Sequence, residues 1–328
     1  FKFIHIFIHL YCSFSINHCT IIKKEEYDLK TRQLGSSDLH ISEISLGCMS
    51  LPTNLQDASY IIDEALDFGI NYFDTADLYN HGLNEEIVGQ LIKEKRKDIV
   101  LATKVGNVWD KQGNSWHWDA SKAHIKTGIK DSLHRLQTDY IDVYQLHGGT
   151  IDDHWDEVIE AFEELKQEGL IREYGISSIR PNVLKRFLPA SNAISVMMQY
   201  SLLDRRPEEW LDFIQENGAS IVTRGSIAKG LLTNEWQKRL INTDGYLSYS
   251  KDELQNTLTK LSQATPLILA ASLKTILNHT AIASAVVGAS TKEQLSSTIH
   301  AYEAMESIDN IEEIISLTKP DFYTSHRD

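Results

Sequence analysis

Four side chains of types that could act together in proton transfer stand at or just after the ends of short apolar segments. Asp74 ends one segment and Tyr79 follows it, Lys104 lies near the end of the next, and His147 follows a third. If these segments are parallel neighbouring strands, their carboxyl ends meet at one edge of the sheet. The spacing therefore predicts that the four side chains converge.

Each of these residues also has an ordinary structural interpretation. An aspartate at a strand end is often a cap or turn former, Tyr79 could be a half-buried loop aromatic, and His147 a hydrogen-bonded core histidine. Lys104 weakens this interpretation, because a lysine inside Leu-Ala-Thr-Lys-Val would be buried and would need an anionic partner. Asp74 on the neighbouring strand can be that partner.

Together these groups suit the reduction of a carbonyl. A phenol has a pKa of about 10, and an adjacent ammonium lowers that pKa by stabilising the phenolate. Lys104, held by Asp74, can do this to Tyr79, while His147 hydrogen-bonds the substrate oxygen or relays a proton. Because no side chain donates hydride, a reduced nicotinamide cofactor is implied.

These residues belong to a chain in which apolar segments alternate with amphipathic helical segments eight times. Strands separated by such helices run parallel, and eight units in about 270 residues fit a closed (β/α)8 or TIM barrel, an α/β fold. No Gly-x-Gly-x-x-Gly follows a strand, which argues against a dinucleotide-binding open sheet. The predicted strand and helix pairs are 43–49 and 57–68, 71–75 and 84–95, 99–105 and 120–136, 140–146 and 155–167, 172–177 and 181–187, 194–201 and 207–216, 220–225 and 251–277, and 283–288 and 292–305.

Three further segments complete the predicted barrel. Tyr27–Ser42 alternates around a Gly-Ser-Ser-Asp turn and predicts a β-hairpin, which we expect to close the N-terminal mouth. Gly106–Asp119 and Lys229–Ser250 are longer than a barrel loop needs and follow strand ends, where active-site loops belong. Asn84 is expected to cap the helix that ends the Tyr79 loop.

Composition bounds the class of protein. The 328 residues are 42% apolar, enough for a large core in one domain over residues 27–328. Lys and Arg total 32 against 46 Asp and Glu, a net charge of −14 that argues against a nucleic-acid partner. The three cysteines lack metal-binding spacing, so we expect no metal site and a reducing compartment, the cytoplasm.

Residues 1–26 do not match the rest of the chain. They are rich in aromatic and β-branched residues, with polar residues interrupting every apolar run. A secretory signal would need a cleaner apolar run and a cleavage site with small residues. We expect an N-terminal extension, artefactual or poorly ordered, in preference to a membrane or targeting segment.

Five motifs in this order and at this spacing resemble the aldo-keto reductase superfamily. They are Gly-Ile-Asn-Tyr-Phe-Asp-Thr-Ala-Asp-Leu-Tyr, Ala-Thr-Lys-Val-Gly, Tyr-Gln-Leu-His, Tyr-Gly-Ile-Ser-Ser and Val-Val-Gly-Ala-Ser-Thr-Lys-Glu-Gln-Leu, and the resemblance covers about residues 27–304. It implies a barrel and a catalytic tetrad of Asp74, Tyr79, Lys104 and His147.

The resemblance also implies where the cofactor binds. Ser177 and Ser178 would hold the nicotinamide carboxamide together with Gln199, and Ser178 stands where the family usually has Asn. A hydroxyl can still donate or accept there, with a shorter reach. The other implied contacts are Gly47, Met49 and Asp74 near the nicotinamide, Arg224 stacked on its ring, Gly225, Ser226, Ile227 and Lys229 along the pyrophosphate, and Gly288, Ser290, Lys292 and Gln294 at the adenine end.

The cofactor implied by the resemblance is NADP rather than NAD. Many relatives hold the 2′-phosphate with a basic residue in the turn after the last strand, but Ser290 occupies a position that is often Arg. Lys292 is the cation of this turn, and Ser297 and Thr298 stand where Glu and Asn are common. These departures weaken the preference for NADP without reversing it.

Two other functions stay open at this point. Lys104 could form a Schiff base in a lyase, although that chemistry needs a neutral lysine and an Asp74 partner argues against it. The chain could also be a regulatory subunit that binds nicotinamide without turnover, as some relatives associated with potassium channels do. The expected substrate is a small carbonyl compound, whose identity depends on the two long loops. The oligomeric state leaves no readable mark.

Overall fold

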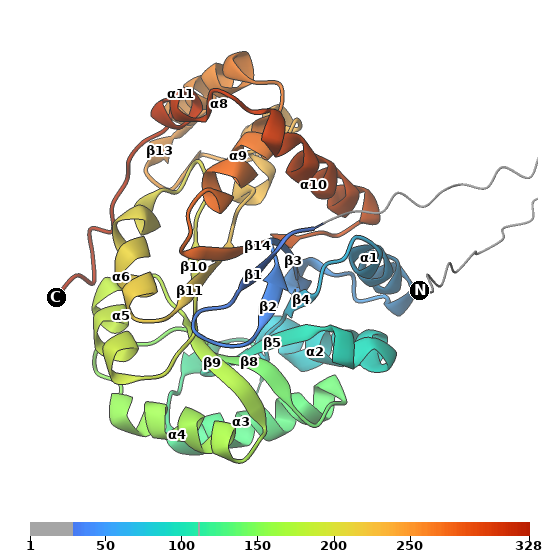
Figure 1. Ribbon diagram of the computed structural model, residues 1–328, viewed down its shortest axis with the longest axis vertical. Helices are drawn as coiled ribbons and strands as arrows, with labels where there is room; N and C mark the ends of the chain where they lie inside the picture. The colour runs from blue at the N-terminus through green and yellow to red at the C-terminus, as the bar shows by residue number, and fades with distance from the viewer. Residues whose placement is uncertain (1–28, 111) are drawn as a thin grey trace, which may run out of the picture.

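The centre of the molecule is a closed barrel of eight parallel strands surrounded by helices (Figure 1), seen in a computed structural model that describes residues 29–110 and 112–328. Neighbouring strands follow the order β10-β11-β14-β3-β4-β5-β8-β9 around the barrel. This confirms the predicted (β/α)8 fold. The expectation for residues 1–26 lies outside the described residues. The barrel strands are β3 (Ile44–Gly47), β4 (Tyr72–Asp74), β5 (Val100–Val105), β8 (Ile141–Leu146), β9 (Ile171–Ser177), β10 (Ser195–Gln199), β11 (Ser220–Arg224) and β14 (Ile282–Gly288).

The predicted helices occur in the predicted order, but α7 (Trp236–Ile241) and α11 (Ile311–Ser316) were not predicted, and the predicted helix 207–216 is a 3-10 helix over Arg206–Trp210 followed by a short α-helix. The predicted helix 251–277 is two helices, because Thr265 before Pro266 has an extended backbone and the residue before a proline disfavours helix. The helices are α1 (Leu55–Asp67), α2 (Leu83–Ile92), α3 (Lys122–Leu136), α4 (Trp155–Gln167), α5 (Pro181–Phe187), α6 (Leu211–Glu216), α7 (Trp236–Ile241), α8 (Lys251–Ala264), α9 (Ile268–Leu277), α10 (Lys292–Ala304) and α11 (Ile311–Ser316).

A β-hairpin of β1 (Thr31–Gln33) and β2 (His40–Ser42) covers the N-terminal end of the barrel, as expected, and crosses the ring of strands in Figure 1. Its backbone is tied to the start of β11, since the Gly35 N–H donates to Ser220 Oγ at 2.9 Å. The side chains of Leu34, Leu39 and Ile41 are buried in one cluster with apolar residues of the barrel strands. The hairpin therefore closes this mouth with apolar side chains.

The two long loops form additional elements after strand ends. The loop after β5 contains an antiparallel hairpin of β6 (Asn107–Trp109) and β7 (Trp116–Trp118). The loop after β11 contains α7 and a short hairpin of β12 (Gly245–Tyr246) and β13 (Tyr249–Ser250). Both insertions therefore stand at the carboxyl ends of the barrel strands.

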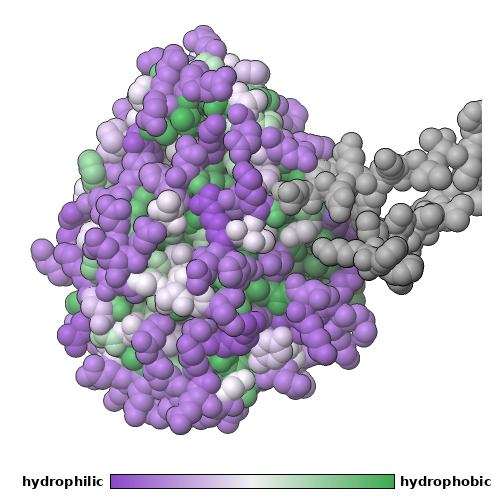
Figure 2. All heavy atoms as spheres, viewed as in Figure 1, coloured by the Kyte–Doolittle hydropathy of each residue, from purple (hydrophilic) through white to green (hydrophobic). Residues whose placement is uncertain are grey.

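The polarity of the surface and the lengths of the helices bear on how the protein meets its surroundings. The face shown in Figure 2 is covered mainly by hydrophilic residues, in keeping with the charged composition. Within the part of the chain that the structure describes, no helix has the length and apolar character needed to cross a membrane.

Candidate active site

Asp74, Tyr79 and Lys104 meet at the carboxyl ends of β4 and β5. Lys104 is fully buried, and its Nζ donates to Asp74 Oδ2 at 2.6 Å and to the Thr75 carbonyl at 2.7 Å. The third contact of Nζ is with the Tyr79 hydroxyl, at 3.4 Å. The ammonium has three protons, so these three oxygens satisfy all of its donors. The predicted pairing of Lys104 with Asp74 is thus present, and Tyr79 adjoins it.

A tight turn after β4 places the Tyr79 phenol. Asn80 and His81 have left-handed φ values of 49° and 56°, and Gly82 has a φ of 86°. A Cβ on Gly82 would lie 2.7 Å from Arg135 Cδ, so glycine also leaves room for that side chain. The turn directly follows Tyr79 and leads the chain into α2, while the Tyr79 hydroxyl faces Lys104 Nζ.

The helix that follows begins differently from the prediction. Helix α2 starts at Leu83 with Gly82 in the cap position, so the expectation that Asn84 caps it is wrong. Asn84 is buried instead, where its Oδ1 accepts from Thr75 Oγ1 at 2.6 Å and its amide donates to the Cys48 carbonyl at 2.8 Å. These bonds tie α2 to the residue after Asp74, and they satisfy the amide better than a helix cap would.

Beside Asn84, Glu85 forms a second buried anchor beneath the site. Its carboxylate accepts from Thr103 Oγ1 at 2.5 Å and pairs with Arg135 Nε at 2.6 Å. Thr103 precedes Lys104 in β5, so this contact fixes the strand that carries the lysine. Glu85 stands in the first turn of α2, and the packing of α2 on α3 buries it.

His147 stands across from Tyr79. The two ring centroids are 6.0 Å apart with an interplanar angle of 84°. The backbone N–H of His147 donates to the Val105 carbonyl at 2.7 Å, and Asn107 Nδ2 donates to the backbone carbonyl of His147 at 3.2 Å. Burial, Lys104 and Arg224 lower the pKa of the imidazole to about 3. His147 is therefore neutral at physiological pH.

The pKa of Tyr79 differs from the prediction that Lys104 lowers it. Burial raises the pKa of the phenol above its ordinary value, although Lys104 opposes the rise. Burial would lower the pKa of Lys104, but Asp74 and Tyr79 raise it, so the lysine stays charged. Burial also raises the pKa of Asp74 against the opposing effect of Lys104. The phenol is thus protonated, and Lys104 moderates its pKa without bringing it below the usual range.

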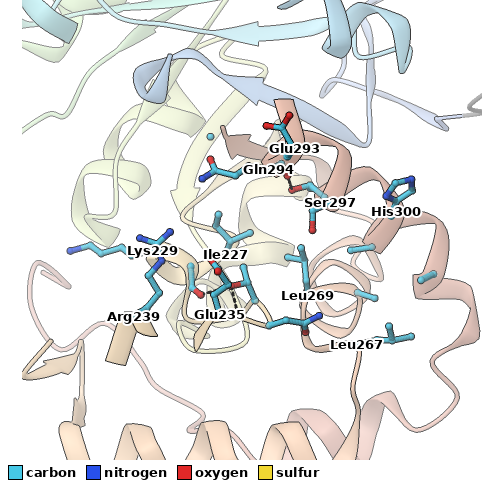
Figure 3. A pocket seen from close by; sticks show the side chains of 18 of the residues that line it. Ile227, Lys229, Glu235, Arg239, Leu267, Leu269, Glu293, Gln294, Ser297 and His300 are labelled. Carbon is cyan, nitrogen blue, oxygen red and sulfur yellow. Dashed lines mark hydrogen bonds between the residues drawn. The ribbon is translucent and has the colours of Figure 1, made fainter. Parts of the chain in front are cut away.

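A cavity of about 570 Å³ lies between the loop after β11 and helix α10 (Figure 3). In Figure 3, Lys229 and Arg239 lie on one side of it and Leu267 and His300 on the other. Arg239 was not predicted, because it lies on α7 inside an insertion that the motifs do not cover. The predicted residues that line this long cavity are Ile227, Lys229, Gly288, Ser290 and Gln294.

A second, small cavity of about 120 Å³ opens beside His147. Its lining includes Gly148, the predicted Ser177, Ser178 and Arg224, and Arg180, which was not predicted. Gln199 adjoins Arg224, since Arg224 Nη1 donates to Gln199 Oε1 at 2.8 Å. The Gln199 amide nitrogen in turn donates to the Tyr246 hydroxyl at 3.3 Å.

Several predicted cofactor residues line neither cavity. The Ser226 hydroxyl is buried and bonded to Thr223 Oγ1 at 2.9 Å, while Met49 is 63% exposed. Lys292 begins α10 on the surface. The other predicted residues outside the two linings are Gly47, Asp74, Gln199 and Gly225.

The family model of the Aldo/keto reductase family matches residues 43–319. The chain belongs to this family. It is 53% identical over 305 residues to the uncharacterized oxidoreductase YqkF of Bacillus subtilis (strain 168). The alignment covers 91% of this chain and 100% of that protein. The solved holo structure of the aldo-keto reductase AKR11C1 from Bacillus halodurans has 54% identity and a TM-score of 0.87, over 92% of this chain and 100% of that one.

Two less similar relatives bear on the alternatives. The NADH-specific methylglyoxal reductase of Escherichia coli (strain K12) is 28% identical over 83% of this chain and 93% of its own length. A probable voltage-gated potassium channel subunit beta of Oryza sativa subsp. japonica is 26% identical over 91% of this chain and 100% of its own. Aldo-keto reductases use a nicotinamide cofactor, and the chain is an oxidoreductase of this family.

The residues of the site fit a nicotinamide dinucleotide. Asp74 Oδ1 and His147 Nδ1 are buried without a hydrogen-bond partner among the described residues, so each can bond to a bound molecule. No carboxylate in the described ranges pairs with Lys229 or Arg239, whereas the neighbouring Glu235 pairs with Lys238. Glu235 and Glu293 also line the cavity, and Lys238 together with Arg239 lowers the pKa of Glu235. Neither Lys229 nor Arg239 is held in an ion pair among the described residues, so both can bind the phosphates of a dinucleotide.

Proposed function

We propose that the chain reduces aldehydes or ketones to alcohols with NAD(P)H, using Tyr79 as the proton donor. The observation that carries the proposal is the contact of the protonated Tyr79 phenol with the buried Lys104–Asp74 pair. Membership of the aldo-keto reductase family supports the same reaction class.

Each residue has a role that follows from its contacts. Tyr79 donates its proton to the carbonyl oxygen, and the Lys104 ammonium stabilises the phenolate that remains. Asp74 holds Lys104 charged and in place. Neutral His147 donates a hydrogen bond to the same oxygen from the other side of the mouth. The reduced nicotinamide supplies the hydride that reaches the carbonyl carbon.

We propose NADPH as the preferred cofactor. The unpaired Lys229 and Arg239 on the wall of the long cavity support an additional phosphate, while Ser290 and Lys292 contribute less than the basic turn of many relatives. Oxidation of NADPH and of NADH, measured side by side with a panel of aldehydes, ketones and quinones, checks the preference. A higher kcat/KM with NADH would overturn it.

The proposed reaction also implies a class of substrate and a cellular compartment. We take the substrate to be a small carbonyl compound, with no nucleic-acid or membrane partner. The buried free thiol of Cys48 is compatible with a reducing compartment such as the cytoplasm.

The decisive test of the proposed reaction is Tyr79→Phe. This variant removes one hydroxyl from a half-buried ring, so the fold and cofactor binding should persist. Carbonyl reduction should fall by about 10²–10⁴-fold, the usual contribution of a positioned acid. Cofactor affinity is measured by fluorescence titration and turnover by the loss of NADPH absorbance. Wild-type turnover in Tyr79→Phe would sink the assignment.

The alternatives are less well supported. A Schiff base at Lys104 needs a neutral amine, but its ammonium is bonded to three oxygens and Asp74 keeps it charged. A regulatory subunit without turnover matches the name of the potassium channel relative, and the complete tetrad argues against it here. Tight NADPH binding with no oxidation by any reactive aldehyde would favour this alternative.

A further inference from the structure

The two cavities are joined by one loop, residues 224–230. Arg224 lines the small cavity, and Ile227, Lys229 and Gly230 line the long one. The small cavity adjoins the catalytic residues, because Gly148 in its wall follows His147. A dinucleotide that lies along the loop therefore has its nicotinamide end at the small cavity and its adenosine end in the long cavity.

Arg180 reaches the small cavity from the turn between β9 and α5. Its Nη1 donates to the Gly149 carbonyl at 2.6 Å, and Gly149 follows His147 by two residues. Arg224 reaches the same cavity from the end of β11, held by Gln199 Oε1 at 2.8 Å. Both guanidinium groups are thus fixed at the cavity by neutral oxygen acceptors.

Neither arginine is neutralised by an acidic group. Across residues 29–110 and 112–328, no carboxylate lies within ion-pair distance of Arg180 or Arg224. A guanidinium stays charged in proteins, so two uncompensated positive charges border the small cavity. The described arginines that do have a carboxylate partner are Arg32, Arg96, Arg135, Arg172, Arg205, Arg206 and Arg327.

We infer that Arg180 and Arg224 make the site bind the reduced nicotinamide more tightly than the oxidised one. This inference rests on the proposed function for the presence of the cofactor. The oxidised ring is a cation, whereas the reduced ring is neutral, and uncompensated positive charges beside the site oppose a cationic ligand. The bias favours release of the oxidised cofactor after each turnover and so favours reduction over alcohol oxidation.

The neutral state of His147 agrees with this inference. Burial is the largest cause of the low pKa of its imidazole, and the positive charges of Lys104 and Arg224 lower that pKa further. Lys104 is paired with Asp74, whereas Arg224 has no carboxylate partner among the described residues, so Arg224 supplies uncompensated positive charge beside His147. Arg180 is the new element here, since neither the motifs nor the catalytic roles assign it.

The test measures binding and needs no turnover. NADPH and NADP⁺ are titrated separately into the full-length protein, with fluorescence or calorimetry as the readout. The variants are Arg180→Gln, Arg224→Gln and, as the matched control, Arg186→Gln, which removes an exposed arginine of α5 with the same change in net charge. Far-UV circular dichroism and thermal melts show whether each variant is folded.

The expected result is a change in selectivity. Wild-type protein should bind NADPH more tightly than NADP⁺, and Arg180→Gln should narrow that ratio by about tenfold, through tighter binding of NADP⁺. Arg224→Gln should narrow it in the same direction, and Arg186→Gln should leave it unchanged. Arg180→Lys keeps the charge and should keep most of the ratio.

Four outcomes would count against the inference. Equal loss of affinity for both forms would make Arg180 and Arg224 general binding or structural residues. Retention of the ratio in both glutamine variants would remove the charge argument altogether. If wild-type protein binds neither form, the proposed function fails and the inference fails with it, whereas binding without selectivity overturns the inference alone.

Discussion

Lys104 and Asp74 form a buried ion pair whose two members depend on each other. Replacing Lys104 with Met leaves the Asp74 carboxylate buried without its partner, which should lower the free energy of unfolding by about 3–5 kcal/mol. Carbonyl reduction should also be lost, because the phenolate of Tyr79 has no ammonium beside it. Urea unfolding and NADPH oxidation measure the two effects.

The double variant Asp74→Asn with Lys104→Met separates stability from catalysis. It removes both charges, so most of the lost stability should return while activity stays low. A double variant that reduces carbonyls at the wild-type rate would show that Lys104 has no role in the proton transfer.

The buried imidazole of His147 makes stability depend on pH. Its folded-state pKa of about 3 lies below the unfolded value of 6.5, so the unfolded state binds the proton first on acidification. The stabilising contribution is complete above pH 6.5 and is lost as the pH falls from there towards 3. Between about pH 7 and about pH 5 the loss should be about 2 kcal/mol.

Urea unfolding at several pH values checks this linkage. His147→Asn should reduce the pH dependence of the unfolding free energy over that range, and His40→Asn, at an exposed histidine, should not. An unchanged pH dependence in His147→Asn would contradict the low pKa of the imidazole.

At the scale of elements, the β1–β2 hairpin contributes to stability from the end of the barrel opposite Tyr79. Leu34 is fully buried there, so Leu34→Ala should lower the free energy of unfolding by about 2–5 kcal/mol. The kcat of the folded protein should stay unchanged, because the substitution lies far from the catalytic mouth. Leu55→Ala, at a leucine that is 40% exposed, is the control and should change stability by less than about 0.5 kcal/mol.

Both quantities come from the same preparations, by urea unfolding and by NADPH oxidation well below the melting temperature. A large fall in kcat for folded Leu34→Ala would mean that the hairpin also positions the catalytic mouth.

The sequence predicted those features that the strand pattern dictates. Asp74, Lys104 and His147 converge because each ends a parallel strand, and parallel strands in one barrel place their ends at one mouth. The burial of Lys104 also followed from its apolar neighbours in β5. Its anionic partner could be named because the adjacent strand ends in a carboxylate.

Other features depend on packing that a single segment does not encode. Asn84 has the composition of a cap, but its amide reaches Thr75 and the Cys48 carbonyl, which come from other elements. Arg180 and Arg239 reach the cavities because of how turns and insertions fold back, and no motif marks them. The break between α8 and α9 could have been predicted from the Thr265-Pro266 pair, because a residue before proline disfavours helix. The apolar periodicity across 251–277 led instead to the prediction of one continuous helix.

At the scale of the whole molecule, the C-terminal tail links the insertion after β11 to helix α5, and Figure 1 shows it running from α11 past α6. The Lys319 N–H donates to the Tyr249 hydroxyl of β13 at 2.6 Å. At the other end, the Asn182 N–H donates to the His326 carbonyl at 2.7 Å. Tyr323 between them is only 5% exposed. The tail thus holds the β12–β13 hairpin against the barrel.

This hairpin carries the Tyr246 hydroxyl that accepts from Gln199, so the tail should influence cofactor binding from a distance. A chain that ends at Thr318 should keep its far-UV spectrum but bind NADPH about tenfold more weakly, with a lower melting temperature. Arg327→Gln is the control, because the Arg327 side chain is 44% exposed and its pair with Glu209 should contribute less than about 1 kcal/mol. If the shortened chain binds NADPH as the full chain does, the β12–β13 hairpin is held without the tail.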